Sequence, residues 1–377
     1  MKTILVTGSK GFMGRNICVA LRREPGVRVV EFDLDQPSSE LSALVQQSDV
    51  VFHLAGVNRP LEVGEFMAGN ANLTRQLCEL LQHAGRKTPL VISSSIQAEL
   101  DNPYGQSKRA AEEVALGYSR ATGAAVYIYR FPNVFGKWSR PNYNTVVATF
   151  CHQISRDLPV QISNPANLIQ FVYIDDIVRA FTGIARITDH APVDPYQEIR
   201  SVYAITLGKL HELILSFRRS VAATSLPDLS NPLVKYLHST YLSFCDPQDL
   251  ARPVDLKTDN RGWLFELIKS PQAGQIFVSR THPGITRGNH YHDTKIEKFC
   301  VIQGQGVIRF RHVLGRDVIE YPVDDRSIRI VDIPSGYTHS IENTGTEDML
   351  TLFWANEIFD PLQPDTYPMP VLSPGSP

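Results

Sequence analysis

A histidine pair and a glutamate lie close together in "GITRGNHYHDTKIEKFCVIQG" (284–304), and "PSGYTHSIEN" (334–343) adds another histidine. Successive side chains of a strand point to opposite faces, so histidines two residues apart can reach one ion. Three imidazole nitrogens and one carboxylate suit a divalent transition ion such as Zn²⁺. The candidate ligands are His290, His292, Glu297 and His339.

A tyrosine and a lysine in "NPYGQSK" (102–108) could transfer protons. The spacing of Tyr104 and Lys108 puts both side chains on one face of a helix. A phenol with a pKa of ~10 is a poor acid or base at neutral pH. A neighbouring ammonium stabilises the phenolate and lowers that pKa. Upstream, "ISSSIQ" (92–97) supplies hydroxyls that could hold a substrate carbonyl.

A glycine-rich turn, "TGSKGFMG" (7–14), stands between a predicted strand and a predicted helix. Its glycine spacing lets backbone N–H groups approach a pyrophosphate, which the start of a helix attracts. A plain strand–helix turn is the alternative, but the strand–turn–helix context favours a dinucleotide site. The residues of the turn that we expect at the cofactor are Gly8, Gly11, Phe12, Met13 and Gly14.

Two residues point to different nicotinamide cofactors. Asp33 ends the second predicted strand, 19 residues after Gly14. An acid at this place usually bonds the ribose 2′-hydroxyl of NAD and disfavours a 2′-phosphate. Arg15, directly after the third glycine, could instead pair with the 2′-phosphate of NADP. The choice between NAD(H) and NADP(H) therefore stays open.

The elements that must position these residues alternate in the first third of the chain. Strands are predicted within 4–8, 27–33, 49–56, 89–95 and 124–136, with helices at 12–24 and 72–85. Such alternation predicts a doubly wound parallel sheet of the Rossmann type. The following region is mixed, with helices at 144–157 and 206–219 and a loop-rich stretch at 224–235.

The pattern changes after about residue 246. Short β-rich runs with glycine or asparagine turns predict an all-β barrel or jelly roll. The proline-rich tail 360–377 is expected to be extended or disordered. We therefore predict two domains, an α/β domain at 1–245 and an all-β domain at 246–377.

Composition excludes several classes of protein. The 377 residues carry a formal net charge of −2, which argues against nucleic acid or an anionic membrane as a main partner. The five cysteines are scattered and form no Cys-x-x-Cys, so a reducing cytoplasm is expected. The sequence opens on a strand pattern, which predicts no signal peptide. No apolar run approaches the ~20 residues of a membrane span.

The order of glycine turn, serine-ended strand and Tyr-x-x-x-Lys resembles the extended short-chain dehydrogenase/reductase family over residues 1–245. "DVVFHLAG", "SSS", "YGQSK" and "RFPNVFG" are similar to its sequence blocks. The resemblance implies Ser95 as the catalytic serine, Tyr104 as the proton donor, and Lys108 as the residue that holds the cofactor ribose and tunes Tyr104. It also implies cofactor contacts at Leu54, Ala55 and Gly56, and a nucleotide-sugar contact at Asn133.

The two histidine blocks resemble the two cupin motifs. The first matches fully, whereas Ile328 stands where the second has its leading glycine. This departure touches no ligand. A motif kept as scaffolding without metal, as in some sugar-epimerase cupins, is the alternative to a metal site.

The pairing of a reductase with a cupin resembles the bifunctional enzymes of capsule and O-antigen sugar synthesis, the CapF type. The resemblance implies that the cupin domain epimerises C3 of a UDP-2-acetamido-2,6-dideoxy-4-hexulose. The reductase domain then reduces the C4 ketone with NADPH to the L-talose configuration, on the route to UDP-N-acetyl-L-fucosamine. It also implies a homodimer.

Two other functions remain possible from the sequence. The cupin could serve only as a metal-stabilised dimerisation module, which would leave a simple nucleotide-sugar 4-reductase. The chain could also be a non-catalytic sensor of sugar nucleotides, although the intact Ser95, Tyr104 and Lys108 argue against a sensor.

Overall fold

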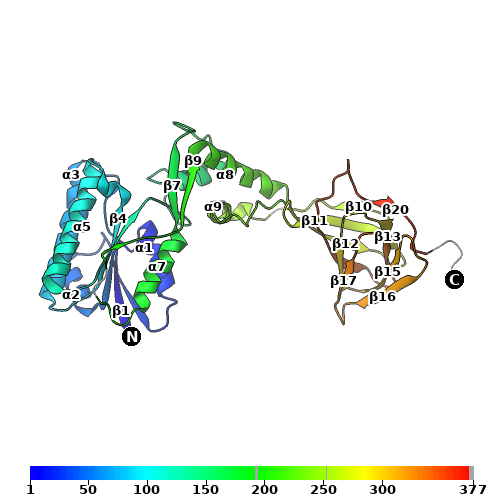
Figure 1. Ribbon diagram of the computed structural model, residues 1–377, viewed down its shortest axis with the longest axis horizontal. Coiled ribbons are helices and arrows are strands. Elements are labelled where there is room, and N and C mark those ends of the chain that lie inside the picture. The colour runs from blue at the N-terminus through cyan, green and yellow to red at the C-terminus, as the bar shows by residue number, and fades with distance from the viewer. Residues whose placement is uncertain (192–193, 252, 373–377) are drawn as a thin grey trace. The chain divides into compact units, whose positions relative to one another are not determined.

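A six-stranded sheet with strand order β2-β1-β3-β4-β5-β8 forms the centre of the N-terminal part, and all its pairings are parallel (Figure 1). The computed structural model describes residues 1–191, 194–251 and 253–372. The chain folds into two compact units, here called the first unit (1–215 with 236–246) and the second unit (216–235 with the residues from 247 onward). The predicted division of the domains near residue 245 stays a prediction.

Helices cover both faces of the parallel sheet. Alternate residues of β1 belong to different cores, since Ile4 packs with Ile17 and Phe181, whereas Leu5 packs with Leu77. The strands are β1 (Lys2–Thr7), β2 (Val27–Phe32), β3 (Val50–His53), β4 (Leu90–Ser95), β5 (Val126–Phe131) and β8 (Tyr196–Gln197). One face carries α1 (Phe12–Leu21) and α7 (Ile174–Arg186), and the other carries α2 (Ser38–Gln47), α4 (Leu73–His83) and α5 (Pro103–Thr122). Burial on both faces is typical of parallel sheets, so the predicted doubly wound fold is confirmed.

The order of the strands reverses at β1, because β2 lies on one side of it and β3 on the other. In open α/β sheets the carboxyl ends of the strands form a ligand crevice at this reversal. The glycine turn follows β1, and Ser95 ends β4 at the same edge of the sheet. The connection from β3 contains α3 (Gly64–Phe66) and a π-helix, η1 (Met67–Asn72), and the connection from β4 contains the 3₁₀ helix η2 (Ile96–Glu99).

The rest of the first unit holds a small sheet of order β6-β7-β9. Its strands are β6 (Asn133–Phe135), β7 (Leu168–Tyr173) and β9 (Val202–Thr206), accompanied by α6 (Val146–Ser155). The helices α8 (Leu207–Ala222) and α9 (Pro232–Leu242) each have residues in both units, and the 3₁₀ helix η3 (Pro247–Asp249) belongs to the second unit. The sequence predicts loop at 224–235, but α9 begins inside that stretch. Asn231 caps it, because its side-chain oxygen accepts the N–H groups of Leu233 and Val234.

Two antiparallel sheets make up most of the second unit, and the all-β fold predicted for the C-terminal domain is confirmed. One sheet is β10 (Lys257–Asp259), β11 (Gly262–Ser270), β12 (Gly274–Thr281), β19 (Met349–Ala355), β14 (Glu297–Gln303) and β17 (Ile330–Ile333). The other is β16 (Val318–Asp324), β15 (Gln305–His312), β18 (Tyr337–Asn343), β13 (Thr286–Tyr291) and β20 (Tyr367–Pro368). Their core includes Phe299 and Phe353, whose rings meet edge to face at 4.6 Å.

The proline-rich tail follows a defined path as far as it is described. It pairs with β13 through β20, and Thr338 and Arg311 donate hydrogen bonds to its main-chain carbonyls. The extended alternative of the prediction therefore holds for part of 360–372, whereas residues 373–377 lie outside the described residues.

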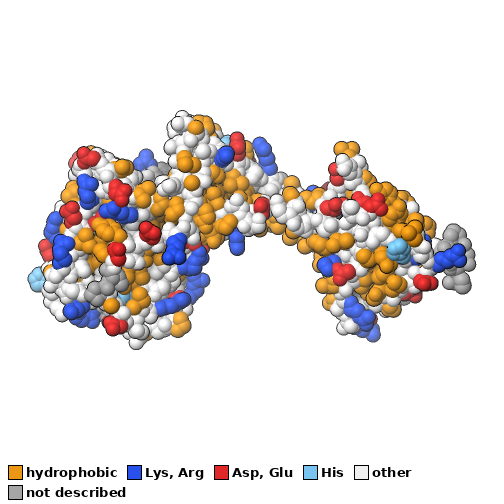
Figure 2. All heavy atoms as spheres, viewed as in Figure 1, with side chains coloured by type: hydrophobic (Ala, Val, Ile, Leu, Met, Phe, Trp, Pro, Cys, Tyr) orange, Lys and Arg blue, Asp and Glu red, His pale blue; other side chains and the backbone are white. Residues whose placement is uncertain are grey.

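On the face seen in Figure 2, acidic and basic side chains are interspersed over the first unit. Among the described helices, none combines the length and apolar character that a bilayer span requires.

Candidate active site and metal centre

The glycines of the turn are required by close backbone contacts. Gly8 has φ +68°, and a Cβ built on it would lie 2.6 Å from the backbone nitrogen of Ala55. A Cβ on Gly14 would lie 2.1 Å from the carbonyl oxygen of Gly8. Ala55, predicted from a separate block of sequence, therefore lies against the glycine turn.

The start of α1 is suited to an anion. Gly11 is its N-cap, and no side chain caps the N–H groups of the first turn. Uncapped N–H groups at a helix N-terminus bind phosphate well, because they donate hydrogen bonds and carry the positive end of the helix dipole. The hydroxyl of Ser9 is buried without a hydrogen-bond partner at the same place. The turn fits the pyrophosphate of a dinucleotide.

Asp33 and Arg15 differ in their surroundings. Oδ2 of Asp33 accepts the backbone N–H of Lys10 at 2.7 Å, so the carboxylate is fixed beside the glycine turn. The Lys10 ammonium pairs with Asp35. Arg15 is exposed on α1. This geometry allows Asp33 to meet an adenosine ribose.

The predicted proton-transfer residues come together at the start of α5. Asn102 caps this helix by accepting the N–H of Gly105 at 2.8 Å. A Cβ on Gly105 would lie 2.1 Å from the carbonyl oxygen of Gln97, so α5 packs tightly on η2, the segment directly after Ser95. Burial raises the pKa of the Tyr104 phenol, and a hydrogen bond with the Ser95 side chain opposes that rise.

Lys108 lies one helical turn after Tyr104 on α5, and its side chain is buried. Its ammonium donates to the carbonyl of Ser93 at 3.0 Å and lies 6.0 Å from the centre of the Tyr104 ring. Burial lowers the pKa of Lys108 to about 8, although Glu112 favours the charged form. A lysine with a pKa close to neutrality can exchange its proton readily during a reaction.

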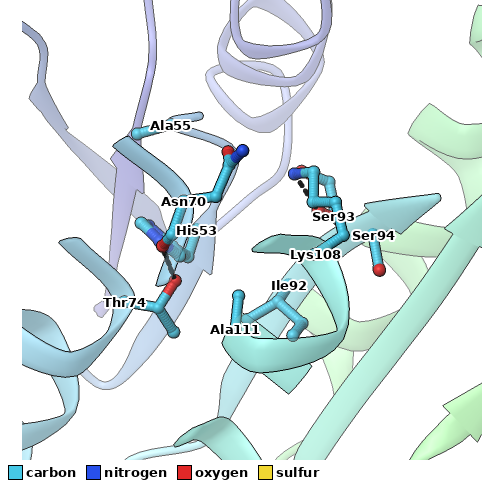
Figure 3. A pocket seen from close by; sticks show the side chains of 9 residues that line it. All are labelled: His53, Ala55, Asn70, Thr74, Ile92, Ser93, Ser94, Lys108 and Ala111. Atoms are coloured by element: carbon cyan, nitrogen blue, oxygen red, sulfur yellow. Dashed lines mark hydrogen bonds between the residues drawn. The ribbon is translucent and has the colours of Figure 1, made fainter. Parts of the chain in front are cut away.

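Lys108 lines a small pocket with about 250 Å³ of empty space, counting the solvent at its mouth (Figure 3). Asn70, in the π-helix η1, lines this pocket. Its side-chain oxygen accepts the N–H of Val57, and its amide nitrogen donates to the Val57 carbonyl and, at 3.0 Å, to the Ser107 hydroxyl. π-Helical turns occur often at functional sites. The sequence patterns did not single out Asn70, because it precedes the helix predicted at 72–85.

The sequence patterns also did not predict the ion pair between Glu112 of α5 and Arg130 of β5. The Glu112 carboxylate accepts hydrogen bonds from Arg130 at 2.9 and 2.6 Å and from the hydroxyl of Ser94. Glu112 lies one helical turn after Lys108 and carries the charge that opposes its loss of a proton. By contrast, Asn133 is exposed on β6 and donates to the Gln170 carbonyl at 3.2 Å.

The four predicted metal ligands also converge, with one ligand atom from each lying within 4.8 Å of the others. Oε2 of Glu297 lies 3.3 Å from Nε2 of His292 and 3.1 Å from Nε2 of His339. The rings of His290 and His339 meet edge to face at 4.6 Å. Burial alone would raise the pKa of the Glu297 carboxyl, but the hydrogen bonds and charges of His292 and His339 lower it.

The donor set fits a divalent cation. Nε2 of His339 is fully buried and makes no hydrogen bond, although a carboxylate oxygen lies close to it. A buried nitrogen left without a partner costs ~1–3 kcal/mol unless something binds it. Three imidazoles and one carboxylate are ligands that zinc commonly takes.

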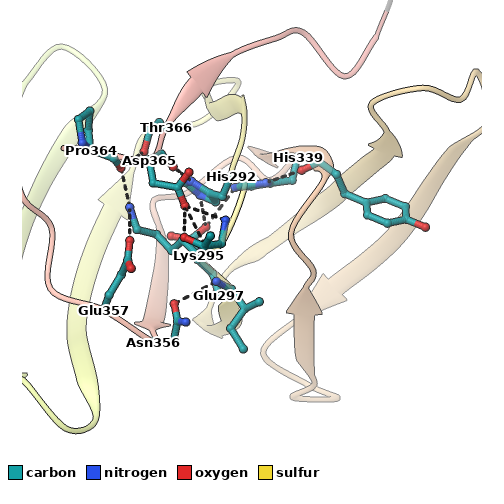
Figure 4. A network of polar contacts seen from close by, with 12 residues as sticks. His292, Lys295, Glu297, His339, Asn356, Glu357, Pro364, Asp365 and Thr366 are labelled. Atoms are coloured by element: carbon teal, nitrogen blue, oxygen red, sulfur yellow. Dashed lines mark hydrogen bonds and ion pairs between the residues drawn. The ribbon is translucent and has the colours of Figure 1, made fainter.

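Residues of the C-terminal segment bond the loop between two candidate metal ligands, His292 and Glu297 (Figure 4). The Asp365 carboxylate accepts the backbone N–H groups of Asp293, Thr294 and Lys295 at 2.8–3.0 Å. The buried Lys295 ammonium donates to the Pro364 carbonyl at 2.7 Å. These bonds fix the loop between His292 and Glu297.

Two family models match the chain. The NAD dependent epimerase/dehydratase family matches residues 4–196, and the polysaccharide biosynthesis C-terminal domain matches residues 257–367. The "UDP-2-acetamido-2,6-beta-L-arabino-hexul-4-ose reductase" of Pseudomonas aeruginosa is 44% identical over 366 residues, 97% of each chain.

Solved structures agree with this. The capsular polysaccharide assembling protein CapF from Staphylococcus aureus has a TM-score of 0.89 and 42% identity, covering 98% of this chain and 100% of that chain. The UDP-glucuronic acid 4-epimerase from Bacillus cereus, with a TM-score of 0.55 and 19% identity over 64% of this chain and 98% of that chain, shares only the fold of the N-terminal part. Because the Pseudomonas aeruginosa reductase and CapF match this chain over nearly the whole length of both chains, and its NAD dependent epimerase/dehydratase domain precedes a polysaccharide biosynthesis C-terminal domain, the chain belongs to the CapF-type family.

Proposed function

We propose that the protein reduces the C4 ketone of a UDP-2-acetamido-2,6-dideoxy-4-hexulose with NAD(P)H, after its second unit has inverted C3 of the same sugar. The observation that carries the reductase part is the meeting of Ser95, Tyr104 and Lys108 beside the crevice of the parallel sheet. The high identity to a relative named as a hexul-4-ose reductase supports the same chemistry.

In the reduction, the nicotinamide supplies a hydride to C4 when the cofactor is bound. Ser95 hydrogen-bonds the C4 oxygen and holds it near the phenol of Tyr104. The phenol then donates its proton to that oxygen as the alcohol forms. Lys108 stabilises the resulting phenolate, because a nearby ammonium favours a negative charge. The product is the L-talose-configured amino sugar, on the route to UDP-N-acetyl-L-fucosamine.

The C3 inversion is proposed for the second unit. A ketone at C4 acidifies the C3 proton, so a base can remove it and form an enolate. Return of a proton to the opposite face inverts the centre. Reduction at C4 then removes the ketone and prevents the new configuration from reverting. This order gives a physical reason for joining the two activities on one chain.

The metal centre also supports a second candidate function, a simple 4-reductase with a metal-stabilised dimerisation module. Three of the four ligands, His292, Glu297 and His339, are buried, and four protein ligands complete the tetrahedral shell of a structural zinc site. Catalytic zinc sites instead keep a position open for water or substrate.

Product NMR with the UDP-4-hexulose in D₂O separates the two candidates. Without reduced cofactor, the bifunctional enzyme should incorporate deuterium at C3 and invert that centre. With reduced cofactor, it should also yield the C4 alcohol. A simple reductase would form the alcohol without C3 exchange. No cofactor oxidation with either C3 epimer would contradict both functions.

A further inference from the structure

The second unit contains a cavity that opens beside the metal centre. It has about 450 Å³ of empty space, counting the solvent at its mouth. Apolar side chains, among them Phe277, Phe299 and Phe353, form much of its wall, and the metal-ligand candidates His290 and Glu297 line one part. The cavity therefore joins an apolar wall to the candidate metal ligands.

The cavity has one cationic wall residue, Arg287, in the described part of the chain. Its Nε donates to the Thr281 hydroxyl at 3.0 Å and its Nη2 donates to the Arg280 carbonyl at 3.1 Å. In the described residues no ion pair joins Arg287 to an acidic side chain, whereas its neighbour Arg261 pairs with Asp259. The guanidinium thus hydrogen-bonds only neutral acceptors, and Asp259, which favours its charge, acts on it without a direct ion pair in the described residues.

A β-bulge turns Arg287 toward the same side as the metal ligands. Strict alternation would place residues 287 and 290 on opposite faces of β13. The register shifts between Gly288 and His290, so that Arg287 lies opposite Ile341 and His290 opposite His339. Residues 339 and 341 share one face of β18. The bulge, with φ +92° at Gly288 and φ +59° at Asn289, therefore places the arginine and the histidine on one wall.

An unsatisfied hydroxyl shows that the cavity is built for a polar ligand. Ser279, 1% exposed, lines the cavity, and its hydroxyl has no hydrogen-bond partner. A buried hydroxyl without a partner is costly, so a bound polar group or water is expected to satisfy it. Aromatic walls can pack against a sugar ring, and a hydroxyl and a guanidinium without an ion pair of its own can hydrogen-bond its hydroxyl and carbonyl oxygens.

We propose that this cavity binds the 4-keto sugar ring and that Arg287 is a catalytic residue of the C3 inversion, donating hydrogen bonds to the C4 oxygen. The inference rests on the proposed function of the second unit. When a base takes the C3 proton, the C–H electron pair forms the C3=C4 double bond and the carbonyl π pair moves onto the C4 oxygen. Arg287 stabilises this oxyanion. Water gives a proton to the other face of C3 as the carbonyl re-forms, and the hydroxide that is left takes the first proton from the base. The base and the water are thus restored, and no oxidant or reductant is consumed.

Exchange kinetics in D₂O without cofactor test the proposal in the full chain. Arg287→Gln should lower the kcat of C3 exchange by about 10²–10³-fold, the usual effect of removing one oxyanion donor. Arg287→Lys should fall between it and the wild type, because charge remains while the planar fork is lost. The matched control is Arg261→Gln, which removes an arginine whose charge is already paired and should exchange like the wild type.

Two further readouts separate the failures. Reduction of a hexulose that already has the inverted C3 should be unchanged in Arg287→Gln, and its metal content and thermal midpoint should match the wild type. If Arg287→Gln is unstable, Arg287→Lys decides on the same criteria. A wild-type kcat in the folded variants would overturn the inference. So would a rise in KM alone, because it would show that Arg287 binds the diphosphate of the substrate instead. No exchange in the wild type and in Arg261→Gln would instead overturn the proposed C3 inversion, and the role of Arg287 with it.

Discussion

Nδ1 of His292 donates a hydrogen bond to the main-chain carbonyl of Asp365, 73 residues further along the chain. A carbonyl can only accept, so this bond makes Nδ1 the protonated nitrogen and turns Nε2 toward Glu297, 3.3 Å from its Oε2. Such outer contacts orient the ligands of metal sites. The C-terminal segment thus orients a residue of the candidate metal site, although it supplies none of the predicted ligands.

Removal of the Asp365 side chain should weaken metal binding. Asp365→Ala loses the acceptor of three backbone N–H groups and puts an alanine at φ +38°, so the carbonyl beside His292 should shift. We expect a ~10–100-fold loss of zinc affinity, measured by competition with a chelator. Asp360→Ala, which loses only the bond to the Leu362 N–H, is the matched control. Equal affinity of both variants would remove Asp365 from the metal centre.

Loss of a proposed ligand should release the ion and destabilise the second unit. His290→Ala leaves an incomplete shell, and metal binding is coupled to folding. We expect a lower thermal midpoint of the second unit and substoichiometric metal by elemental analysis. If metal content stays at that of the wild type, His290 is not a ligand. A chelated enzyme that stays folded but loses all C3 exchange would show that the ion is catalytic.

The two reactions should be separable at Tyr104. Tyr104→Phe keeps the ring that packs at 5.5 Å from Phe66 and removes only the hydroxyl. Cofactor oxidation should fall by at least ~10²-fold, since general acid catalysis contributes about that much. C3 exchange should be unchanged, because it is proposed for the other unit. Simultaneous loss of both activities would argue against independent sites.

Cofactor preference should depend on Asp33. Its carboxylate is fixed by the Lys10 N–H near the expected ribose position, where it would repel a 2′-phosphate. We predict that the wild type uses both NADH and NADPH. Asp33→Ala should raise kcat/KM for NADPH relative to NADH. An unchanged ratio of the two values would place Asp33 away from the ribose.

Burial of Lys108 should cost stability at neutral pH. Its folded pKa of about 8 lies below the ordinary lysine value of 10.5, so the unfolded chain binds more protons between these values and wild-type stability rises with pH across that window. Lys108→Met lacks this penalty. It should be more stable than the wild type by roughly 1–3 kcal/mol at pH 7, with a smaller difference at pH 10. Urea unfolding at both values measures this, and a difference independent of pH would contradict the lowered pKa.

Local patterns in the sequence were sufficient for the features set by neighbouring residues. The glycine spacing predicted the turn after β1, because close backbone approach tolerates no side chain there. Four-residue helical spacing predicted that Tyr104 and Lys108 share a face, and two-residue strand spacing predicted that His290 and His292 do. The alternation of strands and helices predicted the parallel sheet, and the later run of short strands predicted the β-rich unit.

Only the tertiary structure revealed the groups that hold these residues. Arg130 reaches Glu112 from the neighbouring strand, Asn70 reaches Ser107 from the π-helix, and Asp365 reaches His292 from the far end of the second unit. The bulge that aligns Arg287 with His290 is a shift in pairing with β18, which period-two alternation within β13 cannot predict. Residue types and short spacings record local backbone geometry, whereas contacts between distant segments depend on how the whole chain packs, and a single sequence carries no local signal for them.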